Sequence, residues 1–396
     1  MLTKSSLTRR SLLGAAASAL ASVPLATAAP ARPRRARAAP LQLTLPGPTG
    51  PHPLGTVAWH LVDRSRADPW QPSRPRELMV QLWYPAHRTH DHPVAPWMSP
   101  AAVPFFEREQ GIPAGALLLP ATHAHAAAPV DRGRRGRPVV LYSPGLRSDR
   151  SLGTVLIEEL ASRGYVVVAI DHTYDADLVE FPGGRVETFA VAGDIDDALI
   201  AKALAVRTAD TRFVLDQLTA LNAGRRRLPV TFAGACDLSR IGMVGHSLGG
   251  ATAAAAIRAD RRLRAGADLD GSLLPPLTAG TDRPFLLFGS DPGPGPNDPS
   301  WDRFWATQYG WKRELALTGS THISFTDLET LMPQAAPALG LTPDRLTQAI
   351  GSLDPHRAIR AQRAYLRAFF DLHLRGLDHH LLDRPSPHCP QVRFLR

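Results

Sequence analysis

The sequence predicts an α/β fold in which a mostly parallel central sheet is flanked by helices. From residue 138 onward, short runs rich in Val, Ile and Leu alternate with stretches of helical pattern. Alternating strands and helices indicate parallel pairing, and continuous apolar runs are typical of strands buried on both faces. Strands are expected at 138–143, 165–170, 240–245, 265–269, 284–289 and 313–317, and helices at about 150–162, 194–221, 248–258, 299–308 and 355–375.

Two further strand-like runs, 54–62 and 78–84, precede this region and are expected to extend the sheet. Residues 39–53 are rich in Pro and Gly, which predicts an irregular N-terminal segment. Residues 85–137 are rich in Pro, Ala and His with little periodicity, which is typical of a surface insertion or cap. We therefore expect a single domain over residues 54–396.

The first 38 residues differ in composition from the rest and indicate an export signal. Residues 1–38 contain seven Lys or Arg and no Asp or Glu. Arg9 and Arg10 precede a mildly apolar, Ala-rich stretch that reaches about Thr27, which is the pattern of a twin-arginine signal. Small residues at 26–28 and at 36–38 offer two cleavage sites. The protein is therefore expected to be secreted.

The leader also accounts for most of the net charge of +9. The remaining residues carry 38 Lys or Arg against 36 Asp or Glu, so the folded part is nearly neutral. Near neutrality argues against nucleic acid as a partner. No later segment reaches the ~18 uninterrupted apolar residues that a spanning helix needs, so contact with a membrane or lipid surface would be transient. Nothing in the sequence indicates the oligomeric state.

The chain has two cysteines, Cys236 and Cys389. In an oxidising compartment they can form one disulfide that ties the C-terminal tail to the loop before strand 240–245. Two unpaired thiols are the alternative. Neither the cysteines nor the histidines between residues 87 and 125 have the neighbours of a metal site. We expect no metal and no organic cofactor.

The hexapeptide Gly245-His246-Ser247-Leu248-Gly249-Gly250 carries the strongest functional signal. It follows an apolar strand pattern and precedes an Ala-rich helical pattern. In that context G-x-S-x-G is a nucleophile elbow, a sharp turn that presents the serine hydroxyl to a general base. The flanking glycines lack the β-carbons that would clash where strand and helix approach. The motif predicts an α/β-hydrolase fold with Ser247 as nucleophile.

The triad partners of such a serine follow it in the chain, first the acid and then the histidine. His322 lies in a Gly/Ser loop just past the strand 313–317, which is the expected position of the base. Asp270 ends the strand after the nucleophile strand, and Asp291 follows the next one. Asp270 is favoured because Asp291 opens a Pro/Gly-rich turn, but Asp291 stays open as the alternative acid.

An oxyanion hole in this fold combines two backbone N–H groups. One belongs to the residue after the nucleophile, Leu248. The other is expected at Leu146, in the loop after strand 138–143, where Gly145 lets the backbone approach closely. An ordinary turn at Pro144-Gly145 is the alternative for this loop.

Four segments follow one another in a characteristic order, namely Tyr142-Ser143-Pro144-Gly145-Leu146, Gly245–Thr252, Ala267-Asp268-Leu269-Asp270 and Gly319-Ser320-Thr321-His322. Together they resemble the platelet-activating-factor acetylhydrolases, which are calcium-independent lipid esterases of α/β-hydrolase fold. The early strand Leu78-Met79-Val80-Gln81-Leu82-Trp83-Tyr84-Pro85 is similar as well. The resemblance runs from about residue 54 to 375, and the order of its motifs is more specific than the elbow alone.

The resemblance implies Ser247 as nucleophile, Asp270 as acid, His322 as base, and Leu146 and Leu248 as oxyanion donors. The family's oxyanion loop usually reads His-Gly-Leu-Gly, whereas this chain has Ser143-Pro144-Gly145-Leu146-Arg147.

The expected protein is a secreted serine esterase that hydrolyses carboxylic esters of lipid-like substrates, including phospholipids with a short sn-2 acyl chain. A secreted lipase or cutinase-like polyester hydrolase is the alternative within enzymes. A catalytically inactive hydrolase fold that serves as a binding protein is the alternative of another class.

Overall fold

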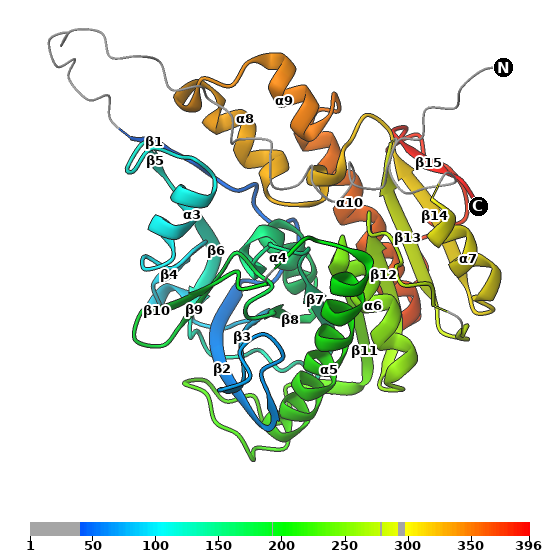
Figure 1. Cartoon of the computed structure of the whole chain (residues 1–396). Helices are drawn as coiled ribbons and strands as arrows, with labels where there is room; N and C mark the ends of the chain where they lie inside the picture. The colour runs from blue at the N-terminus through cyan, green and yellow to red at the C-terminus, as the bar shows by residue number, and fades with distance from the viewer. Residues whose placement is uncertain (1–39, 192, 278, 292–297) are drawn as a thin grey trace, which may run out of the picture.

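The computed structural model describes residues 40–191, 193–277, 279–291 and 298–396. The leader expected over residues 1–38 lies outside the described residues. The described chain forms one large mixed sheet with helices on both of its faces (Figure 1). Within these residues the sheet has eleven strands, in the order β15-β14-β13-β12-β11-β7-β8-β3-β2-β6-β4.

The middle of this sheet is the parallel core that the apolar runs predict. Neighbouring strands from β14 to β8 are parallel, and their residues are almost all buried. The observed bounds differ from the expected ones by a few residues at most, except that β11 begins earlier. The core strands are β7 Arg137–Ser143, β8 Val166–Asp171, β11 Cys236–His246, β12 Leu263–Leu269, β13 Phe285–Ser290 and β14 Lys312–Leu317.

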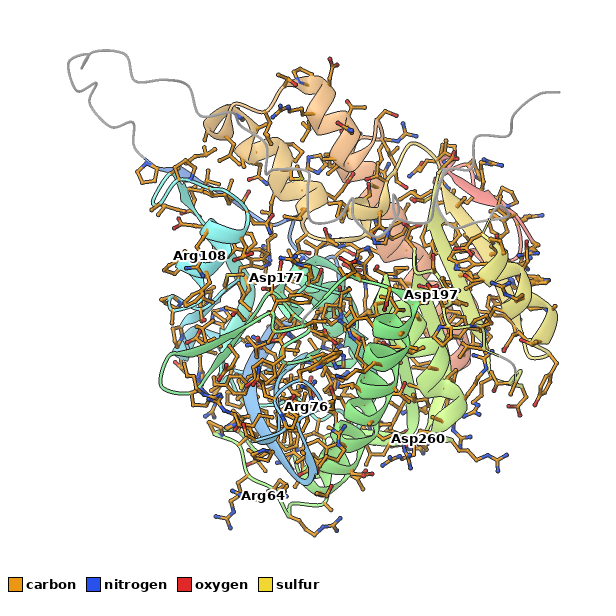
Figure 2. All side chains as sticks on the ribbon, viewed as in Figure 1. Arg64, Arg76, Arg108, Asp177, Asp197 and Asp260 are labelled. Carbon is orange, nitrogen blue, oxygen red and sulfur yellow. The ribbon has the colours of Figure 1, made fainter. Side chains whose placement is uncertain are left out.

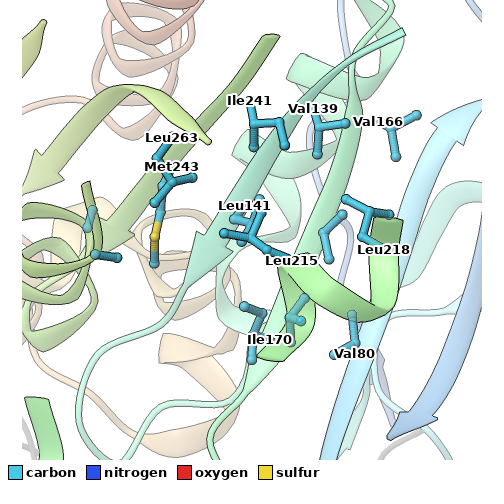
Figure 3. Close-up of a cluster of buried hydrophobic side chains, with 14 of the residues drawn as sticks. Val80, Val139, Leu141, Val166, Ile170, Leu215, Leu218, Ile241, Met243 and Leu263 are labelled. Carbon is cyan, nitrogen blue, oxygen red and sulfur yellow. The ribbon is translucent and has the colours of Figure 1, made fainter. Parts of the chain in front are cut away.

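Helices cover the two faces of the core in two groups. Alternate residues of each strand point to opposite faces, so Leu141 and Met243 pack beneath Leu215 and Leu218 of α5 (Figure 3). Val140 and Val244 face the other way, toward Tyr365 and its neighbours. The helices on the first face are α5 Asp197–Asn222, α6 Leu248–Ala259 and α7 Pro299–Thr307, and those on the second are α4 Thr154–Ser162 and α10 Pro355–Phe370, which continues as a π-turn over Asp371–Arg375.

The N-terminal half extends the sheet. The two expected early strands are antiparallel neighbours, β2 Leu54–Ala67 and β3 Pro75–Pro85, and β3 joins them to β8. Residues 85–137 do more than cover the surface, because β6 Ala121–Ala126 pairs with β2 and β4 Val94–Pro96 pairs with β6. The rest of this segment contains a 3-10 turn Thr89–Asp91, helix α3 Val103–Glu109 and β5 Leu117–Leu118.

Residues 40–53 have little regular structure but are firmly attached. Within them β1 Leu41–Gln42 pairs with β5. Arg363 donates to the carbonyls of Pro46 and Gly47, both at 2.8 Å. Leu43 and Leu45 are buried in a hydrophobic cluster with Trp97, Phe106 and Leu331. This cluster joins the insertion to the C-terminal helices.

Several elements were not expected from the sequence. Helix α8 contains Pro333 and Pro337, residues that ordinarily argue against a helix interior. Helix α9 begins with a Thr342 side-chain cap followed by Pro343 at the first helical position. This pair is a helix-start signal that can be found in a sequence. None of the helices in the described residues is long and apolar enough to cross a bilayer. The unexpected elements are β9 Leu178–Phe181, β10 Arg185–Thr188, α8 Leu328–Leu339, α9 Pro343–Ile350, β15 Val392–Phe394 and the 3-10 turn His322–Phe325. The helix expected at about 150–162 begins with the 3-10 turn Arg150–Gly153 and continues as α4.

The possible disulfide between Cys236 and Cys389 is not formed, and both thiols are free and buried. Cys236 belongs to the hydrophobic cluster under α5 and α6, and Cys389 to the cluster under α4 and α10. The two sulfurs therefore lie with different faces of the sheet. Burial raises the pKa of the Cys236 thiol to about 12 and also raises that of Cys389, so both stay protonated.

Candidate active site

Ser247 occupies the sharp turn that the motif predicts. Strand β11 ends at His246 and helix α6 begins at Leu248. Ser247 itself has φ 56° and ψ −124°, a conformation that residues with a side chain rarely adopt. Its N–H donates to the Leu269 carbonyl at 2.9 Å, which ties the turn to the end of β12. The strained turn places the hydroxyl at the carboxyl edge of the sheet, where ligands bind in such folds.

Glycine is required on both sides of this serine. A β-carbon at Gly249 would lie 1.9 Å from the Ser143 carbonyl oxygen. A β-carbon at Gly245 would lie 2.1 Å from the Gly249 carbonyl carbon. Real β-carbons do not approach backbone atoms this closely, so any other residue would push α6 away from the strands. The steric reason expected for the motif therefore holds in the structure.

His322 and Asp270 are joined by a hydrogen bond. Nδ1–H of His322 donates to Oδ2 of Asp270 at 2.7 Å. The Asp270 side chain is only 1% exposed, and it also accepts from the backbone N–H (2.6 Å) and hydroxyl (3.1 Å) of Ser290. With its Nδ1 proton engaged, neutral His322 carries its free electron pair on Nε2, the atom that a general base uses.

Asp291 does not take part in this arrangement. Its carboxylate lies 3.7 Å from an Arg393 guanidinium nitrogen, and both side chains are partly exposed. Asp270 stands one strand earlier and accepts the histidine proton instead. The alternative acid is thus not supported, because Asp291 pairs with a cation of β15 at the outer side of the sheet.

His246 contacts His322, a contact that the sequence did not indicate. Its Nε2–H donates to the backbone carbonyl of His322 at 2.9 Å, and the two rings lie 4.5 Å apart. Burial, and then the nearby His322, hold the pKa of His246 well below the ordinary value, so the ring stays neutral. The residue before Ser247 therefore anchors the loop that carries His322.

The two residues expected as oxyanion donors lie near Ser247, Leu248 as the next residue and Leu146 through its neighbour Gly145. Gly145 lies against the elbow, since a β-carbon there would be 3.3 Å from the Ser247 β-carbon. Among the described residues, neither the Leu146 N–H nor the Leu248 N–H donates a hydrogen bond. Unpaired N–H groups next to a nucleophile are what an oxyanion hole requires, because they can bind charge that develops on a carbonyl oxygen.

A group of buried charged residues beneath this loop was also missed. Arg207 and Asp210 lie on α5, and both are 0% exposed. They fall among Ala203, Leu204 and Val214 on the buried face of that helix. Charged residues at the helical spacing of an apolar stripe were the signal that could have revealed the group.

One exposed group in the described residues has the composition of a metal site, namely Asp378, His380 and Asp383. It belongs to the C-terminal segment and includes none of Ser247, Asp270 and His322. Exposed acidic groups of this kind are common without an ion, and the group carries no conclusion about the reaction.

A serine on a strand–turn–helix elbow, followed in the chain by a buried aspartate and its histidine, is the arrangement of the α/β-hydrolases. The sequence comparison is more specific. The chain belongs to the family described as platelet-activating factor acetylhydrolase, isoform II, whose model matches residues 41–179 and 205–381.

Individual proteins similar to this chain have names that match this family. A probable 1-alkyl-2-acetylglycerophosphocholine esterase of Arthroderma benhamiae is 28% identical over 384 residues, which cover 90% of this chain and 95% of that protein. A platelet-activating factor acetylhydrolase of Cavia porcellus is 26% identical over 63% of each chain. Among solved structures, a ferulic acid esterase of Streptomyces cinnamoneus matches with a TM-score of 0.74 and 38% identity, over 89% of this chain and 99% of that one.

These similarities show that the protein is a carboxylic ester hydrolase of the platelet-activating factor acetylhydrolase family. The alternative of an inactive binding protein is not supported by them.

The assignment of the acid leads to a paired prediction. Asp270→Asn should lower kcat about 10³–10⁴-fold, because the amide cannot stabilise the imidazolium and favours the wrong tautomer of His322. Asp291→Asn is the matched control and should stay within about threefold of the wild type. Steady-state kinetics on p-nitrophenyl acetate measures both. A full loss in the Asp291 variant with an active Asp270 variant would reverse the assignment.

Proposed function

We propose that this protein is a secreted serine esterase whose nucleophile is Ser247, with His322 as general base and Asp270 as the residue that orients it. The observation that carries the proposal is the hydrogen bond between His322 and the buried Asp270, on the loops next to a strained serine elbow. Leu146 and Leu248 are proposed as the oxyanion donors, because neither N–H group has an acceptor in the described part of the chain and both residues lie next to the elbow.

The proposed reaction has two stages. The Ser247 hydroxyl attacks the ester carbonyl while His322 Nε2 takes its proton, and the oxyanion that forms is bound by the two amides. His322 then returns the proton to the leaving alkoxide, and the acyl group stays on Ser247. Water, deprotonated by His322, then attacks the acyl carbon. The bond from this carbon to Ser247 Oγ breaks, His322 returns the proton to Oγ, and the carboxylic acid leaves. These steps need no metal and no organic cofactor.

The proposed substrates are lipid-like esters with a short acyl group, such as phospholipids with a short sn-2 chain. Support comes from the Arthroderma benhamiae relative, which is described as a probable 1-alkyl-2-acetylglycerophosphocholine esterase and aligns over almost its whole length. An ester of a phenolic acid such as ferulic acid is a second candidate. The Streptomyces cinnamoneus ferulic acid esterase is 38% identical to this chain, compared with 28% for the Arthroderma benhamiae relative. The lipase or cutinase-like alternative is kept as an outcome of the substrate test.

Export is part of the proposal and rests on the Arg9-Arg10 motif ahead of an Ala-rich stretch. Replacing both with Lys, which keeps the charge, should retain the protein inside the cell. Fractionation with immunodetection measures this. Unchanged export of the double variant would remove the twin-arginine assignment and leave the esterase assignment untouched.

The nucleophile is tested by Ser247→Ala. Without the hydroxyl no acyl-enzyme can form, so kcat should fall on the order of 10⁵–10⁶-fold and labelling by a fluorophosphonate should disappear. Ser272→Ala is the matched control, since Ser272 follows β12 nearby and its hydroxyl donates to Asp298. A Ser247→Ala variant with full activity would refute the proposed site.

The substrate class is tested by comparing kcat/KM on defined esters. We expect 1-alkyl-2-acetyl-glycerophosphocholine to be preferred at least tenfold over methyl ferulate and over long-chain triacylglycerol. A preference for methyl ferulate would favour the second candidate. Preference for triacylglycerol or release of acid from a polyester film would favour the lipase or cutinase-like alternative.

A further inference from the structure

The loop from Ser143 to Ser148 rests on a buried ion pair. Arg207 of α5 and Asp175, which follows β8, are both completely buried. The guanidinium binds the carboxylate with two hydrogen bonds, Nε to Oδ2 at 2.8 Å and Nη2 to Oδ1 at 2.6 Å. Two parallel bonds fix the plane of the guanidinium and not only its position.

The same guanidinium binds two successive carbonyls of the loop. Nη1 of Arg207 donates to the Pro144 carbonyl at 2.5 Å, and Nη2 donates to the Gly145 carbonyl at 2.9 Å. Asp175 also holds the loop through its backbone, because its carbonyl accepts from the Arg147 N–H at 2.9 Å. The loop is therefore fastened to one buried pair at three consecutive peptide groups.

This fastening determines where the Leu146 N–H points. The Gly145 carbonyl and the Leu146 N–H belong to one peptide group, and in a trans peptide they point in opposite directions. The bond between residues 145 and 146 is trans, since the cis bond of the described chain is Leu274-Pro275. A carbonyl directed at Arg207 thus directs the Leu146 N–H away from Arg207.

Ser247 lies where a side chain on Gly145 would point. A β-carbon built on Gly145 would be 3.3 Å from the Ser247 β-carbon, and the Leu146 N–H has no acceptor in the described residues. We propose that Arg207, held in place by Asp175, is a positioning residue that sets the orientation of the Leu146 amide for the oxyanion. The inference rests on the proposed function, because it gives that amide its role in the transition state.

A charged pair can hold the backbone carbonyls of Pro144 and Gly145, whereas apolar side chains cannot. An apolar side chain in place of Arg207 would leave the Pro144 carbonyl without a donor among the described residues, and the Gly145 carbonyl would keep only the Ser148 N–H, at 3.2 Å. Arg207 is itself costly to bury, and Asp175 offsets its charge. Lysine could not reproduce the arrangement, because an ammonium lacks the planar fork that serves a carboxylate and two carbonyls together.

A second set of buried hydrogen bonds holds Ser143, the first residue of the loop. The Ser143 hydroxyl lies 3.0 Å from His172 Nε2, and His172 Nδ1–H donates to Asp210 at 3.0 Å. Burial and the nearby Arg207 lower the pKa of His172, so its neutral Nε2 accepts from the hydroxyl. Asp210 of α5 is in turn bound by Arg76 of β3, which is labelled in Figure 2. These side chains resemble a triad but are fully buried, so they support the loop and cannot meet a substrate.

The test compares Arg207→Met with the wild-type enzyme. We expect kcat on p-nitrophenyl acetate to fall about 10²–10³-fold with KM changed less than about threefold, because only the transition state carries the oxyanion. The inhibition constant of an alkyl trifluoromethyl ketone, whose hemiketal places an oxyanion at the same position, should rise by a similar factor. Millimolar guanidinium should restore part of kcat to Arg207→Ala.

Arg363→Met provides the matched control. Arg363 is also a buried arginine that donates to two successive backbone carbonyls, those of Pro46 and Gly47, but it holds the N-terminal segment. Its loss should lower Tm and leave kcat within about threefold at temperatures below the transition. A purely structural Arg207 would give the same pattern as this control.

The outcomes separate this inference from the proposed function. A folded Arg207→Met enzyme with kcat and inhibitor affinity near wild type, in a protein whose Ser247 is essential, would overturn only the positioning role. An active Ser247→Ala enzyme would overturn the proposed function itself. If Arg207→Met does not fold, Arg207→Lys decides: it keeps the charge, so a folded Lys variant with unchanged kcat would refute the inference, whereas a loss of tenfold or more would support it.

Discussion

The close approach of three backbone segments around Ser247 is the constraint on which the site depends. Gly249 touches the Ser143 carbonyl, and Gly271 allows the segment after β12 to contact the Ser247 carbonyl, since a β-carbon there would be 2.2 Å away. The elbow, the loop from Ser143 to Ser148 and the segment after Asp270 are thereby packed backbone to backbone. Backbone atoms at this distance are in van der Waals contact, so a shift of one segment would displace the other two.

Around this contact, charged side chains are buried away from water and paired with hydrogen-bond partners. Asp270 is almost fully buried and accepts three hydrogen bonds, two of them from Ser290 and one from His322. Arg207 and Asp175 lie deeper still, beneath the oxyanion loop. Buried charges are stable only when they are paired and hydrogen-bonded, and pairing of this kind also fixes direction. The polar groups near Ser247 are thus oriented before substrate binds, which is the condition for electrostatic stabilisation of a transition state.

The family defines the reaction type, but it does not by itself define the substrate. A relative described as a probable 1-alkyl-2-acetylglycerophosphocholine esterase and a solved ferulic acid esterase are both similar over most of this chain. In this protein, residues 85–137 contribute both to the sheet edge and to the cluster around Trp97 and Leu331, which joins them to α8. Loops and inserted segments of this kind set specificity on a conserved scaffold.

The sequence alone determined the parallel core and Ser247 with its elbow, and it indicated His322 and the preference for Asp270. These depend on local rules: apolar runs, alternation of strands with helices, the glycines of a tight turn, and chain order. The tertiary structure decided what depends on contacts between distant residues. It joined Asp270 to His322 and Asp291 to Arg393, kept Cys236 apart from Cys389, and brought Arg207 beneath the loop of Leu146. No local pattern specifies such contacts, because residues 62 positions apart meet only once the sheet and α5 are packed.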